Sequence, residues 1–512
     1  MRYNLLFQFV ALATLVSPVL AQNYTDALRF NQNNIEGTAR SQAMAGAFGS
    51  LGADLSSMVS NPAGMGVYRA TELGLGFGVN VVSSESDYWG TKTSQDRTKV
   101  PFNTIGVNFN ASSSESSTGL VSSNLFIAYN RLADYNSLSE YRDPYAFNSL
   151  LDYFCTDQQK TAAMTGDLAY NAYLTNDDSF IDDDGNERQI TYNVWENYLG
   201  NGILDDSYRY DSGDGSGLVN IRKRIKTTGR KGEFGFGYAA NVSNKVYIGG
   251  SLNVVTYDYD EVVMHREYFD AANVAANTPL EYTYKSFLDQ DGAGVNFKLG
   301  LIVRPVDFLR VGFAIHSPTF MSISEKYWAQ ISSDYSSAST DDFEYEYRYR
   351  CPSRIVASVS AISSFGLVSF DYERSNNARS KFRSKDDVDF DDDFDSLNDA
   401  MRNDILKATN TFRLGLELSA LNPLYLRLGG RVSTSALNDD YYYNKPVNFA
   451  ISGGIGYRVS YFFVDLSYTG ATTKGDSWVL PDSNENYVYE DNQPALLTQK
   501  SHYGALTIGL RF

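Results

Sequence analysis

The feature that most constrains the fold of this chain is a series of segments with period-two hydrophobicity, joined by alternately short and long connections. Residues 309–316, 411–419, 424–429 and 506–512 each alternate large apolar side chains with small or polar ones. Successive side chains of a β-strand point to opposite faces, so this pattern predicts strands with one apolar and one polar face. A soluble β-sandwich would show the same alternation, and the connections are needed to separate the two folds.

The connections between the predicted strands follow a strict parity. We predict strands at 72–83, 101–110, 120–131, 232–242, 245–259, 293–304, 309–317, 353–362, 366–374, 410–419, 424–434, 448–458, 461–469 and 502–512. The short gaps are 243–244, 305–308, 363–365, 420–423 and 459–460, with the Ser-rich segment 111–119 of intermediate length. The long gaps are 84–100, 132–231, 260–292, 318–352, 375–409, 435–447 and 470–501. All short turns therefore lie at one end of the sheet and all long loops at the other.

This parity favours a membrane barrel over a sandwich. Outer-membrane barrels have an even number of antiparallel strands, short periplasmic turns and long external loops. Strand edges cannot stay unpaired in lipid, so the sheet must close on itself. We therefore predict an all-β fold, a transmembrane antiparallel β-barrel of about 14 strands. No apolar run approaches the ~20 residues of a spanning helix.

The N-terminus carries a secretion signal. Arg2 precedes a short apolar run at 5–16, and Val19-Leu20-Ala21 is a plausible cleavage site. The signal peptide is therefore assigned to residues 1–21, and no Cys follows it that could carry a lipid anchor. Together with the barrel pattern, this signal predicts export to the outer membrane of a Gram-negative bacterium, with outer-membrane lipids as partners.

The composition excludes several classes of partner. Removal of Arg2 with the signal leaves 42 of the 43 Lys and Arg against 61 Asp and Glu, a net charge of −19. An acidic surface argues against nucleic acid. Two cysteines in 512 residues exclude a disulfide-dense scaffold.

Residues 37–66, GTARSQAMAGAFGSLGADLSSMVSNPAGMG, are mostly Gly, Ala and Ser. Small side chains let one backbone approach another closely, but they make a poor core of their own. A barrel of about fourteen strands is too wide for its wall side chains alone to fill. We therefore predict that residues 22–71 form an N-terminal extension and plug inside the barrel of residues 72–512.

Residues 37–66, with the element Asn61-Pro62-Ala63-Gly64, resemble the N-terminal hatch of the FadL/TodX outer-membrane transporters. The resemblance is concentrated in 37–80, and the rest of the chain matches by architecture. It implies passive, porin-like uptake of hydrophobic compounds such as long-chain fatty acids or small aromatics, without energy coupling. It also implies a hatch element at Asn61, Pro62, Ala63 and Gly64. The terminal Phe512 resembles the signal that outer-membrane assembly machinery reads.

Family members release substrate sideways where their third strand kinks inward. The third predicted strand has an unusually polar patch at Ser122, Ser123 and Asn124. We expect this patch to line a lateral opening. The chain departs from the family pattern in the extension 22–36 and in the long acidic loop 132–231.

Charged residues on the polar faces of the strands are expected to line the lumen. They have mixed signs, which predicts cross-strand pairs that stabilise the lumen and hold the plug. The residues are Asp371, Glu373, Arg413, Glu417, Arg427, Asp465 and Arg511. Docking of a substrate carboxylate on Arg413 or Arg427 is a second interpretation.

The loops contain two further features. The acidic runs at 182–187 and 386–393 are rich in oxygen ligands but lack the spacing of a calcium loop, so no metal site is predicted. Cys155 and Cys351 both fall in predicted external loops, where a disulfide between them is possible. We predict no cofactor.

Other functions remain open from the sequence. The main alternative is a haem-binding receptor, with His265, His316 and His502 as possible ligands. A lipid hydrolase needs a Ser–His pair, and none stands out, so we expect no enzyme. A plain porin is disfavoured by the plug segment, and energy-coupled receptors by its short length. We expect a monomer with a hydrophobic small-molecule ligand, whose identity as fatty acid, aromatic hydrocarbon or haem stays open.

Overall fold

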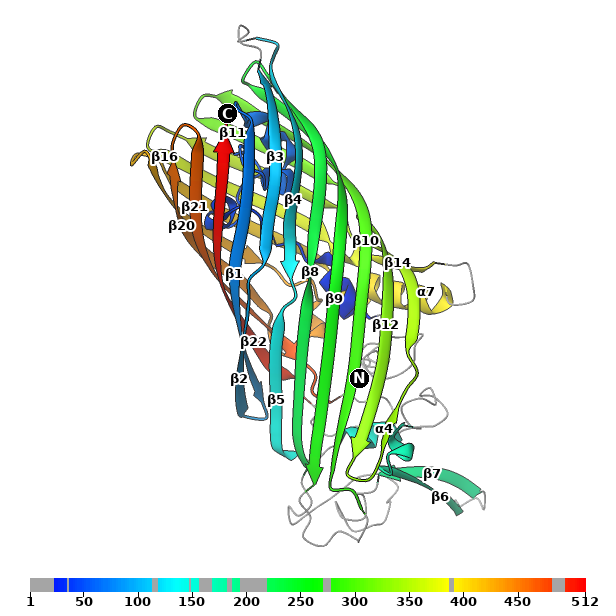
Figure 1. The fold of residues 1–512 in the computed structure, drawn as a ribbon. Coiled ribbons are helices and arrows are strands. Elements are labelled where there is room, and N and C mark those ends of the chain that lie inside the picture. Colours follow the sequence, from blue (N-terminus) through cyan, green and yellow to red (C-terminus); the bar gives the residue numbers. More distant parts are fainter. Residues whose placement is uncertain are drawn as a thin grey trace.

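The computed structural model describes ten stretches of the chain. They are residues 23–34, 36–112, 118–146, 149–155, 168–181, 187–193, 219–269, 278–385, 391–480 and 493–512. Within them the protein is a closed antiparallel barrel of 14 strands, as the sequence predicts (Figure 1). The first strand pairs with the last along sixteen residues, from Glu72↔Arg511 to Asp87↔Leu496, which closes the wall.

Several of the fourteen wall strands are interrupted and therefore consist of two labelled segments. The uninterrupted wall strands are β1 (Glu72–Tyr88), β8 (Val219–Val242), β9 (Val246–Phe269), β10 (Glu281–Val306), β18 (Ala408–Leu418), β19 (Leu424–Ser433), β20 (Val447–Arg458), β21 (Phe462–Ser477) and β22 (Ala495–Arg511). The interrupted ones are β2 (Thr91–Lys99) with β3 (Phe102–Ser112), β4 (Leu120–Asp134) with β5 (Ser137–Ala146), β11 (Leu309–His316) with β12 (Phe320–Ser333), β14 (Phe343–Arg350) with β15 (Arg354–Ile362), and β16 (Gly366–Asn376) with β17 (Lys381–Ser384).

The remaining elements are short. Outside the wall, β6 (Thr175–Ile181) and β7 (Glu187–Asn193) form a separate two-stranded sheet, whereas β13 (Ser337–Ser339) pairs with β12 in the wall sheet. The helices and helical turns are α1 (Tyr24–Asn31), α2 (Ala39–Ala43), α3 (Ser57–Ser60), η3 (Pro62–Val67), α4 (Leu150–Cys155), η4 (Asn377–Arg379), α7 (Asp391–Ala400), η5 (Met401–Ile405) and η6 (Asp439–Tyr441). In the described part of the chain, no helix has the length and apolar character needed to cross a bilayer.

All fourteen predicted strands are present, but the loop assignment is partly wrong. The segments 260–292 and 318–352, predicted as long loops, consist largely of strands. In the first, β9 extends to Phe269 and β10 begins at Glu281; the second contains β12 and β14. Beyond the apolar part the outward positions become polar, as at Asp258, Asp260 and Asp289, so the apolar alternation that marks a strand ends before the strand does.

The outer face of the barrel carries a broad apolar belt. On β1 the exposed positions are Leu73, Leu75, Phe77 and Val79, and every other wall strand contributes residues of the same kind. The short turns lie at the end of the barrel that also holds the C-terminus (Figure 1). One of them, Ser243-Asn244, has both residues at positive φ, as in the type I′ turn that commonly joins hairpin strands. This belt needs a hydrocarbon environment, and the structure is that of a membrane barrel.

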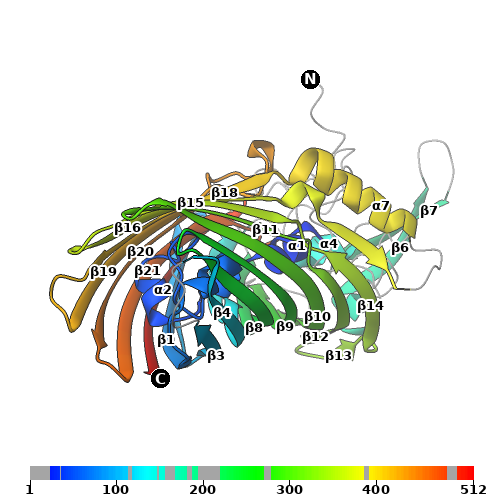
Figure 2. The same cartoon turned by 90° about the horizontal axis from the view of Figure 1, so that it is seen from above.

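The N-terminal elements lie inside the barrel. Seen along the axis, α1 and α2 are surrounded by wall strands (Figure 2). Between Gly37 and Gly66 nearly every residue is buried, although few of them are large. The wall therefore supplies the core that this segment cannot make for itself.

Candidate functional site

Residues 37–66, which we call the plug segment, are bound to the lumen by hydrogen bonds from many wall strands. Ala39 N donates to Thr507 Oγ1 at 2.7 Å, and Ser452 Oγ donates to Ala43 O at 3.0 Å. Arg310 Nη1 donates to Leu51 O at 2.7 Å on another side of the barrel. Because these contacts surround it, the segment crosses the lumen and is not attached to one wall only.

The predicted hatch element occupies the most crowded part of this interface. Asn61 is fully buried; its Nδ2 donates to Gly49 O at 2.6 Å and its Oδ1 accepts from Ala63 N at 3.0 Å. The second bond caps η3, in which Pro62 takes a first-turn position where its missing N–H is not needed. Gly64 N in turn donates to Asn61 O at 2.9 Å. All four residues of the element are buried.

Inward-facing glycines of the wall make room for the plug segment. A Cβ on Gly300 would lie 1.9 Å from Asn61 Oδ1, and one on Gly249, its cross-strand partner, 2.4 Å from Pro62 O. A Cβ on Gly312 would lie 2.2 Å from Gly49 O. Gly415, Gly429 and Gly454 likewise face α2 and the turn after it, as shown by the contacts with Met44, Ala45 and Ala43. We call these six wall glycines the glycine cradle.

The predicted lumen charges face inward and form a buried network around the plug segment. Arg40 of α2 contacts both oxygens of Glu417, at 3.0 and 3.3 Å. Glu417 also accepts from Arg427 at 2.7 Å, and Arg427 binds Asp465 at 2.6 Å. These pairs link β18, β19 and β21 with the plug segment.

The other predicted charges have separate partners. Asp371 accepts from Gly49 N at 2.7 Å and from Ser358 Oγ at 2.5 Å. Arg511, near the end of the last strand, donates to Glu72 Oε2 at 2.7 Å. The first contact holds the plug segment against the wall, and the second links the first and last strands of the barrel.

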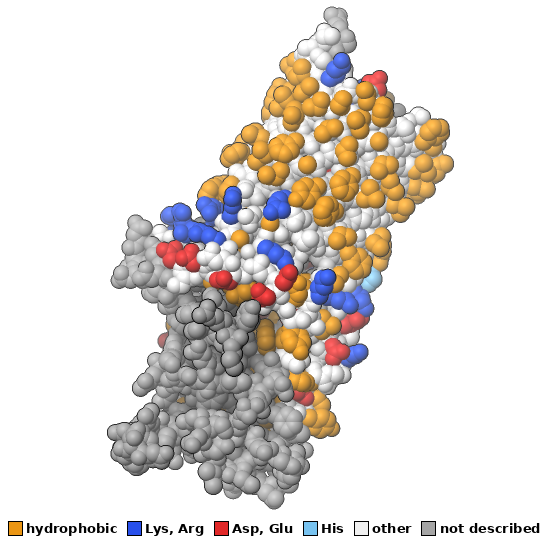
Figure 3. Space-filling view, turned by 180° about the vertical axis from the view of Figure 1, so that it is seen from behind, with side chains coloured by type: hydrophobic (Ala, Val, Ile, Leu, Met, Phe, Trp, Pro, Cys, Tyr) orange, Lys and Arg blue, Asp and Glu red, His pale blue; other side chains and the backbone are white. Residues whose placement is uncertain are grey.

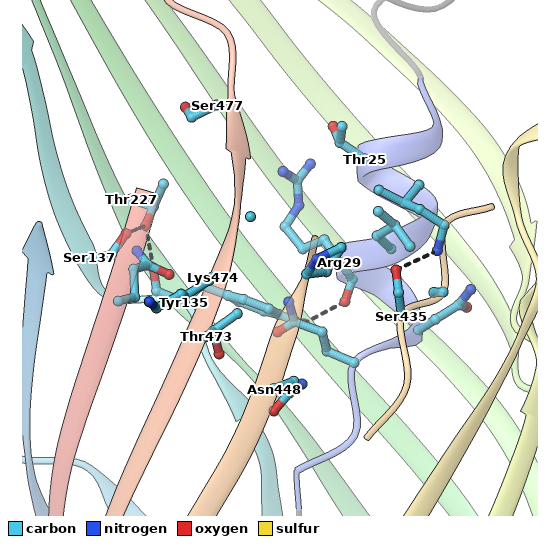
Figure 4. A pocket seen from close by; sticks show the side chains of 18 of the residues that line it. Thr25, Arg29, Tyr135, Ser137, Thr227, Ser435, Asn448, Thr473, Lys474 and Ser477 are labelled. Atoms are coloured by element: carbon cyan, nitrogen blue, oxygen red, sulfur yellow. Dashed lines mark hydrogen bonds between the residues drawn. The ribbon is translucent and has the colours of Figure 1, made fainter. Parts of the chain in front are cut away.

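A large cavity of about 1780 Å³ lies in the lumen beyond the plug segment. Its walls come from α1 and the residues after it, from β8 to β10 and from β18 to β22. Figure 4 shows Thr25 and Arg29 of α1 on one side of it, with Asn448, Thr473 and Lys474 of β20 and β21 facing them. The cavity is the main candidate for a binding site.

One part of this cavity is apolar and aromatic. Leu150, Ile225, Val263, Tyr284, Val479 and Leu480 line it, and several of them continue into a buried cluster at the end far from the short turns. Trp478 also lines this part. Such walls suit a hydrophobic molecule.

Helix α1 forms another wall and is held by aromatic contacts. The Phe30 ring lies 5.0 Å from that of Tyr257 and 4.9 Å from that of Tyr349. The Arg29 guanidinium lies 3.7 Å above the Tyr259 ring and pairs with Asp26. Burial raises the pKa of the Asp26 carboxyl, and the positive charge of Arg29 opposes this shift. The helix is thus anchored, with its polar side on the cavity.

The cavity has an excess of arginine beside α1. Arg354 and Arg413 both pair with Glu373, at 3.4 and 3.0 Å. Arg431 lies opposite Arg413 in the ladder and donates to Asn34 Oδ1 at 3.0 Å, while its Nε has no hydrogen-bond partner among the described residues. Arg354 and Arg413 thus share the Glu373 carboxylate, and Arg431 has no carboxylate of the described residues within 4.0 Å, so an anionic group would be stabilised here.

Lys223 lines the cavity with its amine buried between backbone carbonyl groups. Lys223 Nζ donates to the carbonyl oxygens of Trp478 and Val479, both at 3.0 Å. Burial lowers the pKa of this amine to about 8, and Glu261 opposes the shift. Lys223 thus ties β8 to the apolar wall and titrates within reach of physiological pH.

The predicted lateral opening is absent at Ser122–Asn124. These residues pair with Ser112, Ala111 and Asn110 of β3 on one side, and with β8 on the other. The prediction was wrong because polar residues face the lumen here: Asn124 Oδ1 accepts from the side-chain amides of Asn108 and Asn110. Asn124 Oδ1 is satisfied inside the lumen, whereas Ser122 Oγ and Asn124 Nδ2 have no hydrogen-bond partner among the described residues; the ladder beside them is nevertheless paired on both sides.

The third strand is instead interrupted farther along, between β4 and β5. There β5 pairs with β8, but the described ladders contain no pairing between β5 and β2. Side chains bridge this seam, with Arg97 Nη1 donating to Ser137 O at 3.1 Å. The outward residues Lys92, Ser94 and Asp96 are polar, so the seam lies beyond the apolar belt.

The structure contradicts the possible disulfide, and most of both acidic runs lies outside the described residues. Cys351 is a buried free thiol that contacts Phe30 O at 3.6 Å, so the structure contradicts a bond to Cys155. Residues 182–186 and 386–390 lie outside the described residues, as does the signal peptide. In the described parts of the chain, no cluster of His, Cys, Asp and Glu could hold a metal ion.

The three histidines are not brought together. His265 lines the cavity, but its Nε2 contacts Glu267 Oε1 at 2.6 Å. His316 is buried against Ser60 O at 3.0 Å. His502 contacts Tyr468 on the outer face. No pair of them could ligate one haem from both sides.

Sequence reasoning missed two parts of the site. Residues 23–36 were treated as an extension of unknown role, although the Asn23 capping box, with Asp26 three residues later, signals a helix start. The glycine cradle could also have been predicted from the sequence, because glycine inside a predicted strand often marks the close approach of another backbone.

Comparisons with solved structures agree with this architecture. The toluene transporter TodX of Pseudomonas putida matches with a TM-score of 0.51 and 12% identity, over 94% of this chain and 100% of its own. A FadL homologue of Pseudomonas aeruginosa matches with a TM-score of 0.51 and 11% identity, over 93% and 98%. No family model and no curated protein matches the sequence. The chain thus has a FadL/TodX-type fold.

Proposed function

We propose that this protein is an outer-membrane channel for the passive uptake of hydrophobic small molecules that carry an acidic head group, such as long-chain fatty acids. The supporting observation is the lumen cavity, which combines an apolar wall around Trp478 with three arginines, of which Arg354 and Arg413 pair with Glu373. An amphipathic acid would place its chain against the apolar wall and its carboxylate near Arg431. Neighbours of the same fold include a toluene transporter and a FadL homologue.

Passage past the cavity would involve the plug segment. The wall ladder is continuous within the apolar belt at Ser122–Asn124, which removes the predicted side exit. Most of residues 23–34, together with Glu36, line the cavity, and this part of the chain leads directly into the plug segment. We therefore propose that the solute leaves along the lumen, when the plug segment shifts against the glycine cradle. No energy source is required for this movement.

Ligand binding can be tested through the fluorescence of Trp478, with Trp478→Phe to identify its signal. Oleate should bind the purified protein, and Arg431→Gln should weaken this binding roughly 10- to 150-fold, since one charged hydrogen bond contributes roughly 1.5–3 kcal/mol. Arg304→Gln is the matched control, because Arg304 pairs with Asp307 at a short turn outside the cavity. Oleate binding that is equal in all three proteins would refute the arginine site.

Toluene and haem serve as competing ligands in the same assay. Toluene lacks an anionic group, so its affinity should be equal in the wild type and in Arg431→Gln. Tight toluene binding without oleate binding would point to an aromatic hydrocarbon channel. A haem Soret shift that is lost in His265→Ala would favour the receptor function instead. Mass spectrometry of the molecule that co-purifies with the barrel gives an independent identification.

A further inference from the structure

An arginine cluster lies on the outer face of β14 and β17, away from the lumen. Arg348 and Arg383 are directly opposite each other in the ladder, and so are Arg350 and Lys381. Arg348 and Arg383 are exposed. Figure 3 shows Lys and Arg side chains gathered at the edge of the orange apolar surface on this side of the barrel. We call Arg348, Arg350 and Arg383 the outer arginine cluster.

Like charges directly opposite in an antiparallel pair are destabilising, which makes this arrangement unusual. Within the described residues, no carboxylate lies within 4.0 Å of Arg348, Arg350 or Arg383. Arg350 donates only to a backbone carbonyl, that of Arg379, at 3.1 Å. The guanidinium groups therefore keep most of their donors for an external acceptor.

Other outward cations farther along the same face of the wall do have acidic partners. Arg230 binds Asp258 at 3.1 Å, and Lys326 binds Glu344 at 2.5 Å. The lack of a carboxylate at the outer arginine cluster is thus not a general property of the exposed strands. It points to an anion supplied from outside the chain.

The position of the cluster identifies the source of that anion. Arg350 is the ladder partner of Phe320, which is 57% exposed, and Phe320 pairs in turn with the exposed Val295 of β10. These two apolar residues are the last of the belt on their strands before polar residues begin. The arginines therefore stand at the level where hydrocarbon ends and lipid headgroups begin, on the side of the long loops.

We propose that the outer arginine cluster binds the phosphate groups of a phosphorylated lipid in the outer leaflet. The planar guanidinium group can give two parallel hydrogen bonds to one phosphate, which an ammonium group cannot do. A phosphate between Arg348 and Arg383 would also convert their repulsion into attraction. The proposal rests on the outer-membrane location proposed above but not on transport, so a failed uptake assay leaves it intact.

The test uses the full-length protein in detergent and measures bound lipid by native mass spectrometry. Lipid A with two phosphates is the probe, and the same lipid without phosphates is the control ligand. The wild type should retain the phosphorylated form, and Arg348→Ser/Arg383→Ser should reduce retention at least tenfold. The matched control Arg230→Ser/Lys326→Ser removes two paired cations and should change retention less than twofold.

Three results would overturn the proposal. The first is equal lipid retention in the wild type and in Arg348→Ser/Arg383→Ser. The second is an equal loss of retention in both double variants. The third is displacement of the bound lipid A by inorganic pyrophosphate as effectively as by added lipid A. Should the serine variant fail to fold, Arg348→Lys/Arg383→Lys keeps the charge but loses the paired donors, and it should bind several times more weakly than the wild type.

The acidic run 386–393 follows directly on β17 and provides one more check. One possible outcome is that the wild type binds no lipid, whereas the variant with Asp386, Asp387 and Asp389 replaced by Asn does. The chain itself then neutralises the arginines, and the proposal fails. If lipid binding is already present and the replacement leaves it unchanged, the arginines face the membrane as proposed.

Discussion

Gly300→Ala offers a direct test of how the wall holds the plug segment. The added Cβ would lie 1.9 Å from Asn61 Oδ1 and 2.9 Å from Ala63 N, well inside contact distance. The second of these atoms belongs to the backbone, so a side-chain rotation alone cannot relieve the overlap. Asn61 must move, and its bonds to Gly49 O and Ala63 N are lost together.

The magnitude follows from these two bonds. Losing the Asn61 cap of η3 costs about 0.5–2 kcal/mol. Leaving the buried Gly49 carbonyl without its donor costs about 1–3 kcal/mol. A loss on the order of 2–4 kcal/mol in docking free energy corresponds to a roughly 30- to 700-fold rise in the undocked population, since 1.4 kcal/mol is a factor of ten.

The assay is ion conductance of the purified barrel in planar bilayers. Gly250→Ala is the matched control, because Gly250 lies in the same strand pair, faces outward, and would place its Cβ 3.2 Å from the flexible Leu299 side chain. Open events should rise strongly in Gly300→Ala and stay at the wild-type level in Gly250→Ala. If Gly300→Ala folds and conducts like the control, the cradle does not hold the plug segment.

Three further outcomes are expected. Deletion of residues 37–66 should raise the leakage of small polar solutes, and a folded deletion variant with unchanged conductance would refute the plug assignment. Lys223 should titrate near pH 8 by side-chain NMR, against ~10.4 for an ordinary lysine. Because the pKa is lower in the folded state, the charged amine lowers the free energy of unfolding below pH 8, and this loss disappears as the pH rises toward ~10.4. With Cys155 replaced by Ser, Cys351 should react with maleimide at least tenfold faster in Phe30→Ala than in the parent protein, because α1 covers the thiol; equal rates would show that α1 does not protect it.

The barrel itself could be predicted from the sequence because its chemical requirements are local. The outward positions of each wall strand must be apolar within the belt, as at Phe412, Leu414 and Leu416, and this leaves a period-two pattern. The strand ends beyond the belt could not be predicted in the same way. There the outward side chains meet water, and the buried side is aromatic, as at Tyr347 and Tyr349, so the apolar alternation is lost.

The site was harder to predict because it depends on which distant residues meet. Arg413 and Glu417 could be placed on the lumen side from the pattern alone, but their partners Glu373 and Arg40 depend on register and on the path of the plug segment. The polarity of Ser122–Asn124 was misread because a strand sequence does not reveal whether polar side chains find partners within the lumen. Such partners become visible only when the barrel is closed.

The glycine cradle has a consequence for how this sequence can change over time. Gly300 and Asn61 are 239 positions apart in the chain, yet neither can be replaced freely while the other stays. Substitutions in the N-terminal segment and in the wall are therefore expected to be accepted in compensating pairs. A descendant that lost the N-terminal segment would be released from this constraint, and larger residues could then enter the six glycine positions and stiffen the strands.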